Sequence, residues 1–580
     1  MSYSPQSTIL SMLHGRAGMR PDEVGFTFTD YTADPAGAVE RVTWSQLYRR
    51  TLNAAAELRL HASVGDRAVI LAPQGMEYIT AFLGCMQAGV IAVPLPLPHR
   101  GSGDDRVSAV VDDTAPSIVL TTSAVTADVA EYLDRARLGA APKILDVDAM
   151  DLDGPADEGA DSASGYPATA YLQYSSGSTR RPTGVMVSHR NLKSNFEQLM
   201  RGYFAESQIN TNGMTIVSWL PFYHDMGLVL GVCAPILGGF PAALTSPVAF
   251  LEKPSRWMQA LADNARPFSA APNFAFELAA RKTRDADLAG RDLGGVLGII
   301  NGAERVDPAT LERFADRFSH FNFRDSMLRP SYGLAEATVF VAAGTWKESE
   351  PAVRFDADEL AAGRVRRATK GGTALVRYQL PKSPVVRIVD ADTCRESAAD
   401  VVGEIWVHGD NVAAGYWGLP PESQQCFGTT LLEPSTGTPD GPWLRTGDLG
   451  FVFGGELFIV GRVKDLLIIR GRNHYPEDIE ATVQEISGGR VAAISVSENS
   501  TENLVTVIEV KERGDSAEAV AQGLHDLKND ITAAITKVHG VSAGDLVLVA
   551  PGSIPTTTSG KIRRAACAEL YRDNLLARLG

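Results

Sequence analysis

Residues 174–185 read Tyr174-Ser175-Ser176-Gly177-Ser178-Thr179-Arg180-Arg181-Pro182-Thr183-Gly184-Val185, and a short apolar strand is predicted directly before them at Ala170–Gln173. Small hydroxyl residues and glycines let backbone amides approach a polyanion closely. The hydroxyl and guanidinium groups can donate further hydrogen bonds to its oxygens. The run therefore indicates a phosphate-binding loop, although an ordinary Ser/Gly-rich connector has a similar composition.

The order of residues in this loop is not that of a P-loop. The pattern Gly-x-x-x-x-Gly-Lys-Ser/Thr is absent from the sequence, and Arg180 follows Thr179 where such a motif needs a different residue order. The kinase and GTPase classes that depend on that pattern are therefore excluded.

Composition indicates a large protein that acts on small molecules or proteins. The chain has 580 residues, of which 44% are hydrophobic and 21% charged, so at least two globular domains are expected. The formal net charge of −15 argues against nucleic acid as a partner. Five scattered cysteines without a Cys-x-x-Cys spacing and an N-terminus without an apolar signal segment predict a cytoplasmic protein without disulfides or structural zinc.

One stretch, Met226–Leu251, has no charged residue and is long enough to cross a bilayer. Three prolines and four glycines divide it into shorter pieces. We therefore expect a buried helix followed by a buried strand, and no membrane span.

Short Val/Ile/Leu runs alternate with amphipathic stretches over most of the first 340 residues. This alternation predicts an α/β architecture with parallel sheets that are covered on both faces. The predicted strands are Arg67–Leu71, Val90–Leu95, Ser117–Thr121, Thr215–Ser218 and Leu297–Ile300. The predicted helices are Trp44–Leu58, Gly75–Gln87, Asn191–Met200 and Pro308–Phe318. The Gly/Ala/Asp-rich segment Leu152–Gly165 is expected to be a surface connector.

The second half of the chain changes character after about Asp390. Shorter strands with turns between them predict a small β subdomain, at Gly403–His408, Leu449–Phe453 and Leu457–Val460. Beyond Gly461–Asp465 the pattern predicts a separate α+β domain. Its strands are expected at Leu466–Ile469, Val491–Val496, Leu504–Val510 and Leu546–Val549, and its helices at Pro476–Ile486 and Ala517–Val538.

Further segments follow the loop in a fixed order. They are Tyr332-Gly333-Leu334-Ala335-Glu336, Gly403-Glu404-Ile405-Trp406-Val407-His408-Gly409, Gly415-Tyr416, Trp443-Leu444-Arg445-Thr446-Gly447-Asp448, Gly461-Arg462-Val463-Lys464-Asp465 and Pro555-Thr556-Thr557-Thr558-Ser559-Gly560-Lys561. Together with the loop, this set resembles the ANL family of adenylate-forming enzymes over essentially the whole chain. The family joins a carboxylate to the α-phosphate of ATP and expels pyrophosphate.

This resemblance implies an α/β and α+β multidomain fold. A large N-terminal domain over residues 1–461 would contain two α/β subdomains and a small β subdomain. A hinge over residues 462–465, centred on Lys464, would lead to a small mobile C-terminal domain over residues 466–580. In the family this joint rotates the small domain between two half-reactions.

The resemblance also implies roles for individual residues. The β- and γ-phosphates of ATP would be held by Ser175, Ser176, Gly177, Ser178 and Thr179, with Arg180 nearby. The walls around adenine would be formed by the segment Asn301, Gly302, Ala303 and Glu304 together with Ser331, Tyr332 and Gly333. Asp448 would accept hydrogen bonds from the ribose hydroxyls, and Arg462 would contact ribose or phosphate. Glu336 would help hold Mg²⁺, which prefers carboxylate and phosphate oxygens.

Lys561 is the residue that the resemblance makes catalytic. A long cationic side chain on a mobile Ser-Gly turn can reach the carboxylate and α-phosphate oxygens as negative charge accumulates on them. The alternative, a surface lysine in a flexible tail, is disfavoured by the surrounding segment Pro555–Ile562.

Two segments resemble one branch of the family, the fatty acyl-AMP ligases of mycobacterial type. They are Ser218-Trp219-Leu220-Pro221-Phe222-Tyr223-His224-Asp225-Met226-Gly227-Leu228 and Ser269-Ala270-Ala271-Pro272-Asn273-Phe274-Ala275-Phe276-Glu277. In that branch His224 would lie near the bound carboxylate and donate a hydrogen bond to an acyl oxygen. A histidine that merely caps the following helix is the alternative.

The chain between Glu336 and Asp390 is longer than the corresponding stretch of typical acyl-CoA ligases. The extra piece, within about Trp346–Leu380, resembles the insertion of fatty acyl-AMP ligases, which restrains the small domain and disfavours CoA. A surface loop without function is the alternative. The resemblance thus implies activation of a long-chain fatty acid with ATP and Mg²⁺, then acyl transfer to a carrier-protein phosphopantetheine of a polyketide synthase. A fatty acyl-CoA ligase and a non-catalytic nucleotide- or acyl-binding scaffold stay open as alternatives.

Overall fold

The computed structural model describes most of the chain. The described residues are 8–98, 106–135, 141–156, 166–174, 182–205, 209–344, 352–469, 472–498, 501–512, 516–557 and 560–579. Residues Ser175–Arg181 of the predicted phosphate loop lie outside these ranges, as do residues 157–165 of the connector and the first part of the insertion.

The first sheet of the N-terminal half has six strands in the order β6-β5-β3-β4-β7-β8. Its strands are parallel except for β8, which pairs antiparallel with β7. Continuous apolar runs form these strands because both faces of a parallel sheet are buried. The bounds are β3 Arg67–Ile70, β4 Ile91–Pro94, β5 Ile118–Thr121, β6 Lys143–Asp146, β7 Tyr171–Tyr174 and β8 Gly184–Val187.

The second sheet has eight strands in the order β14-β13-β12-β11-β9-β10-β1-β2. The outer strands β14 and β2 pair antiparallel with their neighbours, and the six inner strands are parallel. The bounds are β1 Val24–Asp30, β2 Ala38–Thr43, β9 Thr215–Ser218, β10 Ala242–Thr245, β11 Pro267–Ala271, β12 Gly298–Asn301, β13 Leu328–Tyr332 and β14 Ala342–Ala343. Two predicted adenine-wall residues, Asn301 and Tyr332, end neighbouring strands, where α/β sheets bind ligands.

Helices cover these two sheets, and one apolar core runs between them. Their bounds are α1 Ile9–Met19, α2 Trp44–Arg59, α3 Met76–Ala88, α4 Arg106–Thr114, α5 Thr126–Arg135, α6 His189–Met200, α7 Asp225–Leu228, α8 Ala234–Gly238, α9 Pro247–Glu252, α10 Ser255–Asp263, α11 Asn273–Lys282 and α12 Pro308–Phe318. A π-helical turn, η3 (Arg201–Ala205), extends α6. The predicted α/β class is therefore confirmed for this half.

The uncharged stretch Met226–Leu251 forms a buried helical run and then a strand, as the sequence predicts. The run consists of α7, the π-helical turn η4 (Val229–Cys233) and α8, and the strand is β10. The sequence did not predict the short helix α9 after it. In the described ranges, no helix is both long and apolar enough to cross a bilayer.

The predicted β subdomain is a six-stranded antiparallel sheet in the order β17-β22-β21-β20-β18-β19. It begins earlier in the chain than the pattern after Asp390 suggested. The bounds are β17 Tyr378–Gln379, β18 Val385–Asp390, β19 Arg395–Glu396, β20 Gly403–His408, β21 Leu444–Phe453 and β22 Glu456–Arg462, with helix α14 at Pro420–Phe427.

The described part of the insertion folds against this sheet. It contains β15 Ala352–Phe355, α13 Ala357–Ala361 and β16 Thr373–Val376, with β15 and β16 paired antiparallel. Phe355 is fully buried, and its ring packs edge-on against Phe451 and Phe458 with centroids 4.8 and 5.0 Å away. A surface loop would not bury an aromatic cluster of this kind. The packing therefore disfavours the alternative of a surface loop without function.

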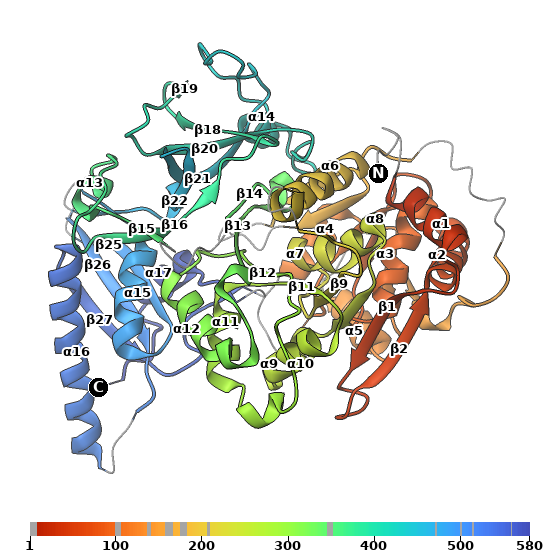
Figure 1. The fold of residues 1–580 in the computed structure, drawn as a ribbon, viewed down its shortest axis with the longest axis horizontal. Helices are drawn as coiled ribbons and strands as arrows, with labels where there is room; N and C mark the ends of the chain where they lie inside the picture. The colour runs from red at the N-terminus through yellow and green to blue at the C-terminus, as the bar shows by residue number, and fades with distance from the viewer. Residues whose placement is uncertain are drawn as a thin grey trace.

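The C-terminal part forms a separate three-stranded sheet, β25-β26-β27, and a two-stranded hairpin, β23-β24. Its bounds are β23 Leu467–Ile469, β24 Arg472–His474, α15 Pro476–Ser487, β25 Val491–Glu498, β26 Thr501–Glu509, α16 Ala517–His539, β27 Ala543–Val549 and α17 Arg564–Arg572. Figure 1 shows this part (blue) and α1 (red) at opposite ends of the molecule, with β11–β13 between them.

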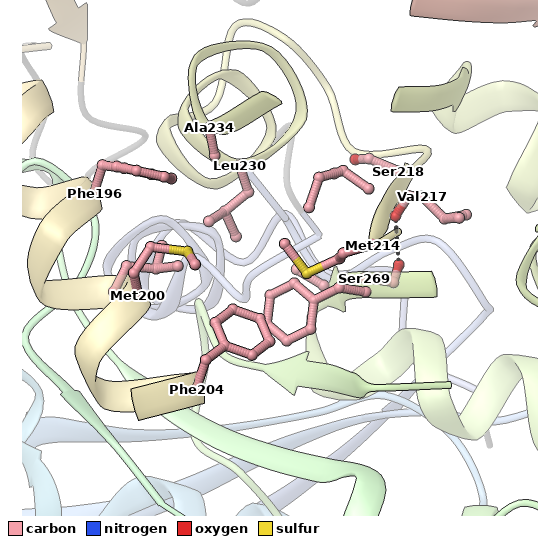
Figure 2. Close-up of a pocket in the computed structure, with 13 residues that line it drawn as sticks. Phe196, Met200, Phe204, Met214, Val217, Ser218, Leu230, Ala234 and Ser269 are labelled. Carbon is pink, nitrogen blue, oxygen red and sulfur yellow. Dashed lines mark hydrogen bonds between the residues drawn. The ribbon is translucent and has the colours of Figure 1, made fainter. Parts of the chain in front are cut away.

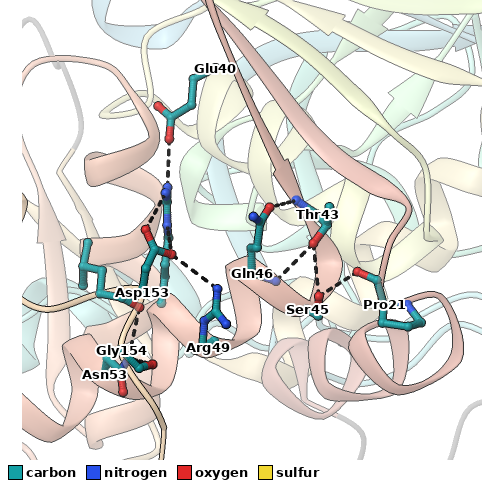
Figure 3. Close-up of polar contacts among 11 residues, drawn as sticks. Pro21, Glu40, Thr43, Ser45, Gln46, Arg49, Asn53, Asp153 and Gly154 are labelled. Atoms are coloured by element: carbon teal, nitrogen blue, oxygen red, sulfur yellow. Dashed lines mark hydrogen bonds and ion pairs between the residues drawn. The ribbon is translucent and has the colours of Figure 1, made fainter.

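The start of the predicted connector is tied to α2 by polar contacts (Figure 3). Arg50 donates to both carboxylate oxygens of Asp153 at 3.0 Å and to Glu40 on β2 at 2.8 Å. The Asn53 amide donates to the carbonyls of Leu152 and Gly154, both at 3.0 Å. A bidentate Arg–carboxylate pair adds geometric specificity, so the connector leaves the first sheet in a fixed direction.

A buried arginine joins the N-terminal helix to α8. Arg16 on α1 is 1% exposed, and its guanidinium donates to the carbonyl of Leu237 at 3.0 Å and to that of Ile236 at 3.5 Å. These carbonyls belong to the last turn of α8, where the backbone has no intrahelical donor. Gly239 leaves room for the guanidinium, because a Cβ there would lie 2.7 Å from the Arg16 Cζ atom.

We expect Arg16→Met to lower the free energy of unfolding of the N-terminal domain by about 2–3 kcal/mol, because buried carbonyls lose a charged donor. Urea unfolding followed by tryptophan fluorescence measures this change. Arg20→Met is the matched control, since Arg20 pairs with Glu23 on the exposed surface and should change stability by less than about 1 kcal/mol. Equal effects of the two substitutions would contradict this account of Arg16.

Candidate active site

Lys561 lies on a tight turn of the C-terminal domain. The Thr557 amide donates to the Lys561 carbonyl at 2.7 Å, and the Lys561 amide donates to the Thr557 hydroxyl at 3.0 Å. Gly560 adopts a φ of +85°, a left-handed conformation that glycine takes without steric cost. The turn therefore fixes the direction in which the lysine side chain leaves the backbone.

Lys561 is half-buried, and its ammonium feels the charges of several groups of the N-terminal domain. Burial and the nearby Arg462 lower the pKa of Lys561 below its ordinary value, and the negative charges of Asp225, Glu304 and Asp448 oppose this decrease. These carboxylates come from three separate segments of the chain. The predicted catalytic lysine thus lies where two domains meet, beside a cluster of acids.

His224 and Asp225 form a close pair at the start of α7. The Nδ1 atom of His224 lies 2.5 Å from a carboxylate oxygen of Asp225, and both side chains are about 15% exposed. Burial raises the pKa of Asp225, but the charges of His224 and Lys561 outweigh this effect and the pKa is lowered overall. His224 occupies the capping position of α7 without a capping hydrogen bond, which disfavours the alternative of a helix cap. The sequence analysis did not select Asp225, although it lies next to His224 in the same segment.

Asp448 lies on β21 opposite Arg462 on β22. One oxygen of Asp448 accepts a hydrogen bond from the Tyr332 hydroxyl at 2.7 Å, and the other accepts one from Arg462 Nε at 3.0 Å. Burial and Asp448 raise the pKa of Tyr332, so its hydroxyl remains a donor. Each carboxylate oxygen has a second lone pair, which leaves acceptor capacity for ribose hydroxyls.

The predicted adenine-wall residues come together at the ends of β12 and β13. A Cβ on Gly302 would lie 3.2 Å from the carbonyl oxygen of Ser331, and one on Gly333 would lie 1.6 Å from that of Val339. Gly333 therefore cannot be replaced without moving the backbone, and at Gly302 a side chain would be tight against Ser331. The side-chain Oδ1 atom of Asn301 is buried and has no hydrogen-bond partner in the described part of the structure, so it is an acceptor that a nucleobase amino group could satisfy.

Glu336 lies in a single helical turn after β13 and is half-buried. The Tyr416 hydroxyl donates to its Oε1 atom at 3.0 Å. Two residues later, Thr338 adopts φ 71° and ψ −63°, and the Val339 amide donates to the Ala337 carbonyl at 2.9 Å. This is a rare, strained γ-turn, and strain of this kind is typical of functional sites.

Glu336 fits a role in binding Mg²⁺ together with a nucleotide. In the described ranges, no group of three or more His, Cys, Asp or Glu side chains could hold a metal ion. Mg²⁺ is commonly bound by one or two carboxylates plus substrate phosphates and water. A half-buried carboxylate held by Tyr416 suits that kind of site and does not suit an all-protein cage.

The ends of the predicted phosphate loop are fixed beside Glu336, although Ser175, Ser176, Gly177, Ser178, Thr179 and Arg180 themselves lie outside the described residues. Tyr174 at the end of β7 pairs with Gly184 at the start of β8. The Trp417 amide donates to the Gly184 carbonyl at 2.7 Å. Tyr416, the partner of Glu336, is therefore directly beside the point where the loop ends.

Contacts join the C-terminal domain to the N-terminal domain around the predicted hinge. Lys464 lies in the helical turn Val463–Asp465, and burial together with Arg462 lowers its pKa. Arg305, which follows the adenine wall, pairs with Asp478 at the start of α15 at 2.6 Å. The Thr373 hydroxyl of the insertion also donates to Asp478 at 3.5 Å, so the insertion takes part in this contact.

An apolar cavity lies behind β9 and β11, between α6 and the helical run that follows His224 (Figure 2). Its lining includes Phe196, Met200, Phe204, Met214 and Leu230. The two serines at its edge have partners, since Ser269 donates to the Val217 carbonyl at 2.6 Å and Ser218 accepts from the Leu220 amide at 3.2 Å. The apolar lining would suit a hydrocarbon chain, but the free space is only about 20 Å³, so the surrounding side chains must move to admit one.

We expect Tyr416→Phe to raise the Mg²⁺ concentration needed for half-maximal activity by about tenfold, because removing an outer partner of a metal-binding carboxylate has effects of this size. Titration of pyrophosphate exchange with Mg²⁺ at saturating ATP measures this change. Tyr571→Phe, which removes a hydroxyl that donates to Asp545 in the C-terminal domain instead, is the control and should leave the titration unchanged. An unchanged midpoint in Tyr416→Phe would contradict the role of this contact.

Comparison with known proteins agrees with this geometry. Residues 14–417 match a family model described as AMP-binding enzyme, and residues 464–578 match one described as Disco-interacting protein 2-like, AMP domain. The chain is 61% identical to a putative fatty-acid–CoA ligase, FadD21, of Mycobacterium leprae over 99% of both chains. It is 56% identical to the long-chain-fatty-acid–AMP ligase FadD28 of Mycobacterium tuberculosis over 98% of both.

A solved structure resembles the whole chain as well. It is that of a fatty acyl-adenylate ligase from L. pneumophila in complex with acyl adenylate and pyrophosphate. The TM-score is 0.71 at 33% sequence identity, and the match covers 98% of this chain and 97% of that one. The chain therefore belongs to the AMP-binding enzymes of the ANL adenylate-forming family, in the branch that contains the fatty acyl-AMP ligases.

Proposed function

We propose that this enzyme activates a long-chain fatty acid with ATP and Mg²⁺ to give acyl-AMP and pyrophosphate. It then transfers the acyl group to the phosphopantetheine thiol of a carrier protein or carrier domain, as in polyketide synthases. The observation that carries this proposal is the position of Lys561 where the two domains meet, with the charges of Asp225, Glu304 and Asp448 acting on its pKa and His224 paired with Asp225 at 2.5 Å. The names of the relatives support it, because they include fatty-acid–AMP and fatty-acid–CoA ligases.

In the first step the fatty carboxylate attacks the α-phosphate, and the bond to the leaving pyrophosphate breaks. Lys561 supplies a fixed positive charge to the carboxylate and α-phosphate oxygens. Asp225 engages the Nδ1 atom of His224, so Nε2 is left for an acyl oxygen and donates to it when the ring carries both protons. Mg²⁺ bound at Glu336 would neutralise phosphate charge.

The position of the apolar cavity supports a long-chain substrate. Ser218 at its edge precedes His224 in the chain, and Leu230 and Ala234 follow it on the same helical run. A carboxylate held near His224 could therefore extend its hydrocarbon tail between this run and α6. Burial of each methylene contributes about 0.8 kcal/mol, which favours long chains over short ones.

The acceptor is the part of the proposal that separates it from an acyl-CoA ligase, which would use the same ATP-binding residues. The insertion packs on the β subdomain through Phe355 and reaches the C-terminal domain through Thr373. Contacts of this kind restrain rotation of the small domain, as expected for the branch that disfavours CoA. A non-catalytic scaffold is disfavoured, because Glu336, Asp448, Arg462 and Lys561 are all present.

We expect Lys561→Ala to abolish acyl-AMP synthesis in a pyrophosphate-exchange assay and to leave acyl transfer from a preformed adenylate largely intact. In the wild type, kcat/KM of adenylation should fall as the pH rises through the lowered pKa of Lys561, since only the ammonium stabilises the phosphate charge. This alkaline decrease should begin below the ordinary lysine range. Lys561→Arg retains its charge at high pH, so its lower rate should not show the decrease. Normal adenylation by Lys561→Ala would disprove the role.

The acceptor can be tested by offering CoA and a phosphopantetheinylated carrier protein separately to the intact enzyme. We expect acyl-AMP to be transferred to the carrier and little acyl-CoA to form. Asp478→Asn weakens the contacts with both Arg305 and Thr373 and should increase CoA use by loosening the small domain. This variant leaves the Phe355 cluster in place, whereas deletion of residues 346–380 would remove it. Substantial CoA ligation by the intact enzyme would refute the preference for a carrier protein.

A further inference from the structure

The Lys561 turn lies against an aromatic side chain of the N-terminal domain. A Cβ built on Gly560 would be 3.4 Å from the Cε1 atom of Phe274, so the edge of this ring lies just beyond the space that a methyl group on Gly560 would fill. Phe274 is the second residue of α11 and is half-buried against the main core. The ring therefore lies beside the turn, one residue before Lys561.

Glu304 holds the backbone that carries this ring. The Phe274 amide donates to the Glu304 Oε1 atom at 2.7 Å. The first amides of a helix have no intrahelical acceptor and carry partial positive charge, so a carboxylate there stabilises the start of α11. Burial raises the pKa of Glu304, and the Phe274 amide and the charge of Lys561 oppose this increase. Glu304 thus faces both the ring-bearing residue and the lysine.

Asn273 fixes the same helix start from its other side. Its Oδ1 atom accepts hydrogen bonds from Asn301 Nδ2 at 3.0 Å and from the Asp307 amide at 3.2 Å. The segment that forms the adenine wall therefore holds the first two residues of α11 at both Asn273 and Phe274. The predicted nucleotide-binding segment therefore sets the position of the ring. Neither Asn273 nor Phe274 has to contact the nucleotide for this.

We propose that the Lys561 turn packs against the ring of Phe274 during adenylation, and that Glu304 and Asn273 hold this ring in place. This inference rests on the proposed function. The ammonium must be placed within a fraction of an ångström to act on the α-phosphate. Because Gly560 has no side chain, the Phe274 ring limits how closely the turn can approach the N-terminal domain. Phe274 is therefore a positioning residue that acts through Lys561.

The test compares the two half-reactions of Phe274→Ala with those of the wild type. We expect the kcat of acyl-AMP synthesis to fall at least about tenfold, because a small misplacement of a catalytic group has effects of this size. KM for ATP and fatty acid should change less than about twofold, since Phe274 does not bind them. Transfer from synthetic acyl-AMP should be unchanged, and Phe274→Leu should recover most of the lost rate.

The control is Leu278→Ala, which removes a similarly half-buried apolar side chain one turn further along α11 and should leave both half-reactions unchanged. Equal loss of both half-reactions in Phe274→Ala, or an unchanged adenylation rate, would disprove the positioning role of Phe274. Hydrogen exchange of the backbone at residues 560–567 should be faster in Phe274→Ala than in the wild type. If the wild type made no acyl-AMP, the proposed function would fail, and the exchange result would still decide whether the ring holds the turn.

Discussion

The active site depends on placing the Lys561 ammonium among carboxylates that belong to another domain. Moving such a charge out of water costs several kcal/mol unless opposite charges compensate for it. Asp225, Glu304 and Asp448 provide this compensation. They follow β9, follow β12 and lie on β21, so the fold must bring three distant strands to one place. Parallel pairing brings the ends of β9 and β12 to one edge of the second sheet, and the Tyr332–Asp448 hydrogen bond joins β21 of the antiparallel sheet to that edge.

A site that is assembled across a domain boundary is complete only in one arrangement of the domains. The pairing of Arg305 with Asp478 and the close approach of Gly560 to Phe274 both join the C-terminal domain to the adenine-wall region. Both must break if the small domain rotates about Lys464 for acyl transfer. Under the proposed function, the Thr373 contact would add to the cost of that motion and would relate the packing of the insertion to the choice of acceptor. Gating by domain rotation would then link the proposed hinge to the two half-reactions.

The sequence predicted much of the fold because buried parallel strands are continuous apolar runs. Strand β9 and helix α12 match the predicted residues at both ends. Strand β2, which lies at a sheet edge and is largely exposed, has no such run and was not predicted. The described part of the insertion also forms a strand pair and a helix that its charged, Gly-rich composition did not indicate.

For the site, motif residues such as Lys561 and Asp448 could be predicted one at a time, because each lies in a recognisable segment. Their contacts could not be predicted. Tyr416 donates to Glu336 across 80 positions of sequence, and Tyr332 donates to Asp448 across 116. Such pairs arise from sheet topology and leave no local pattern. Asp225 was the exception, since its place beside His224 was a signal that the sequence analysis did not use.

The central claim is that the enzyme, with Lys561 placed where the two domains meet, makes and holds an acyl adenylate. The most direct measurement is a rapid-quench reaction of the wild type with ATP, Mg²⁺ and a long-chain fatty acid in the absence of any thiol acceptor. Acyl-AMP is quantified by mass spectrometry and pyrophosphate is measured in parallel. The account predicts a burst of both products in equal amounts, close to one per enzyme molecule. Pyrophosphate release without acyl-AMP, or no release with any fatty acid across a range of chain lengths, would contradict it.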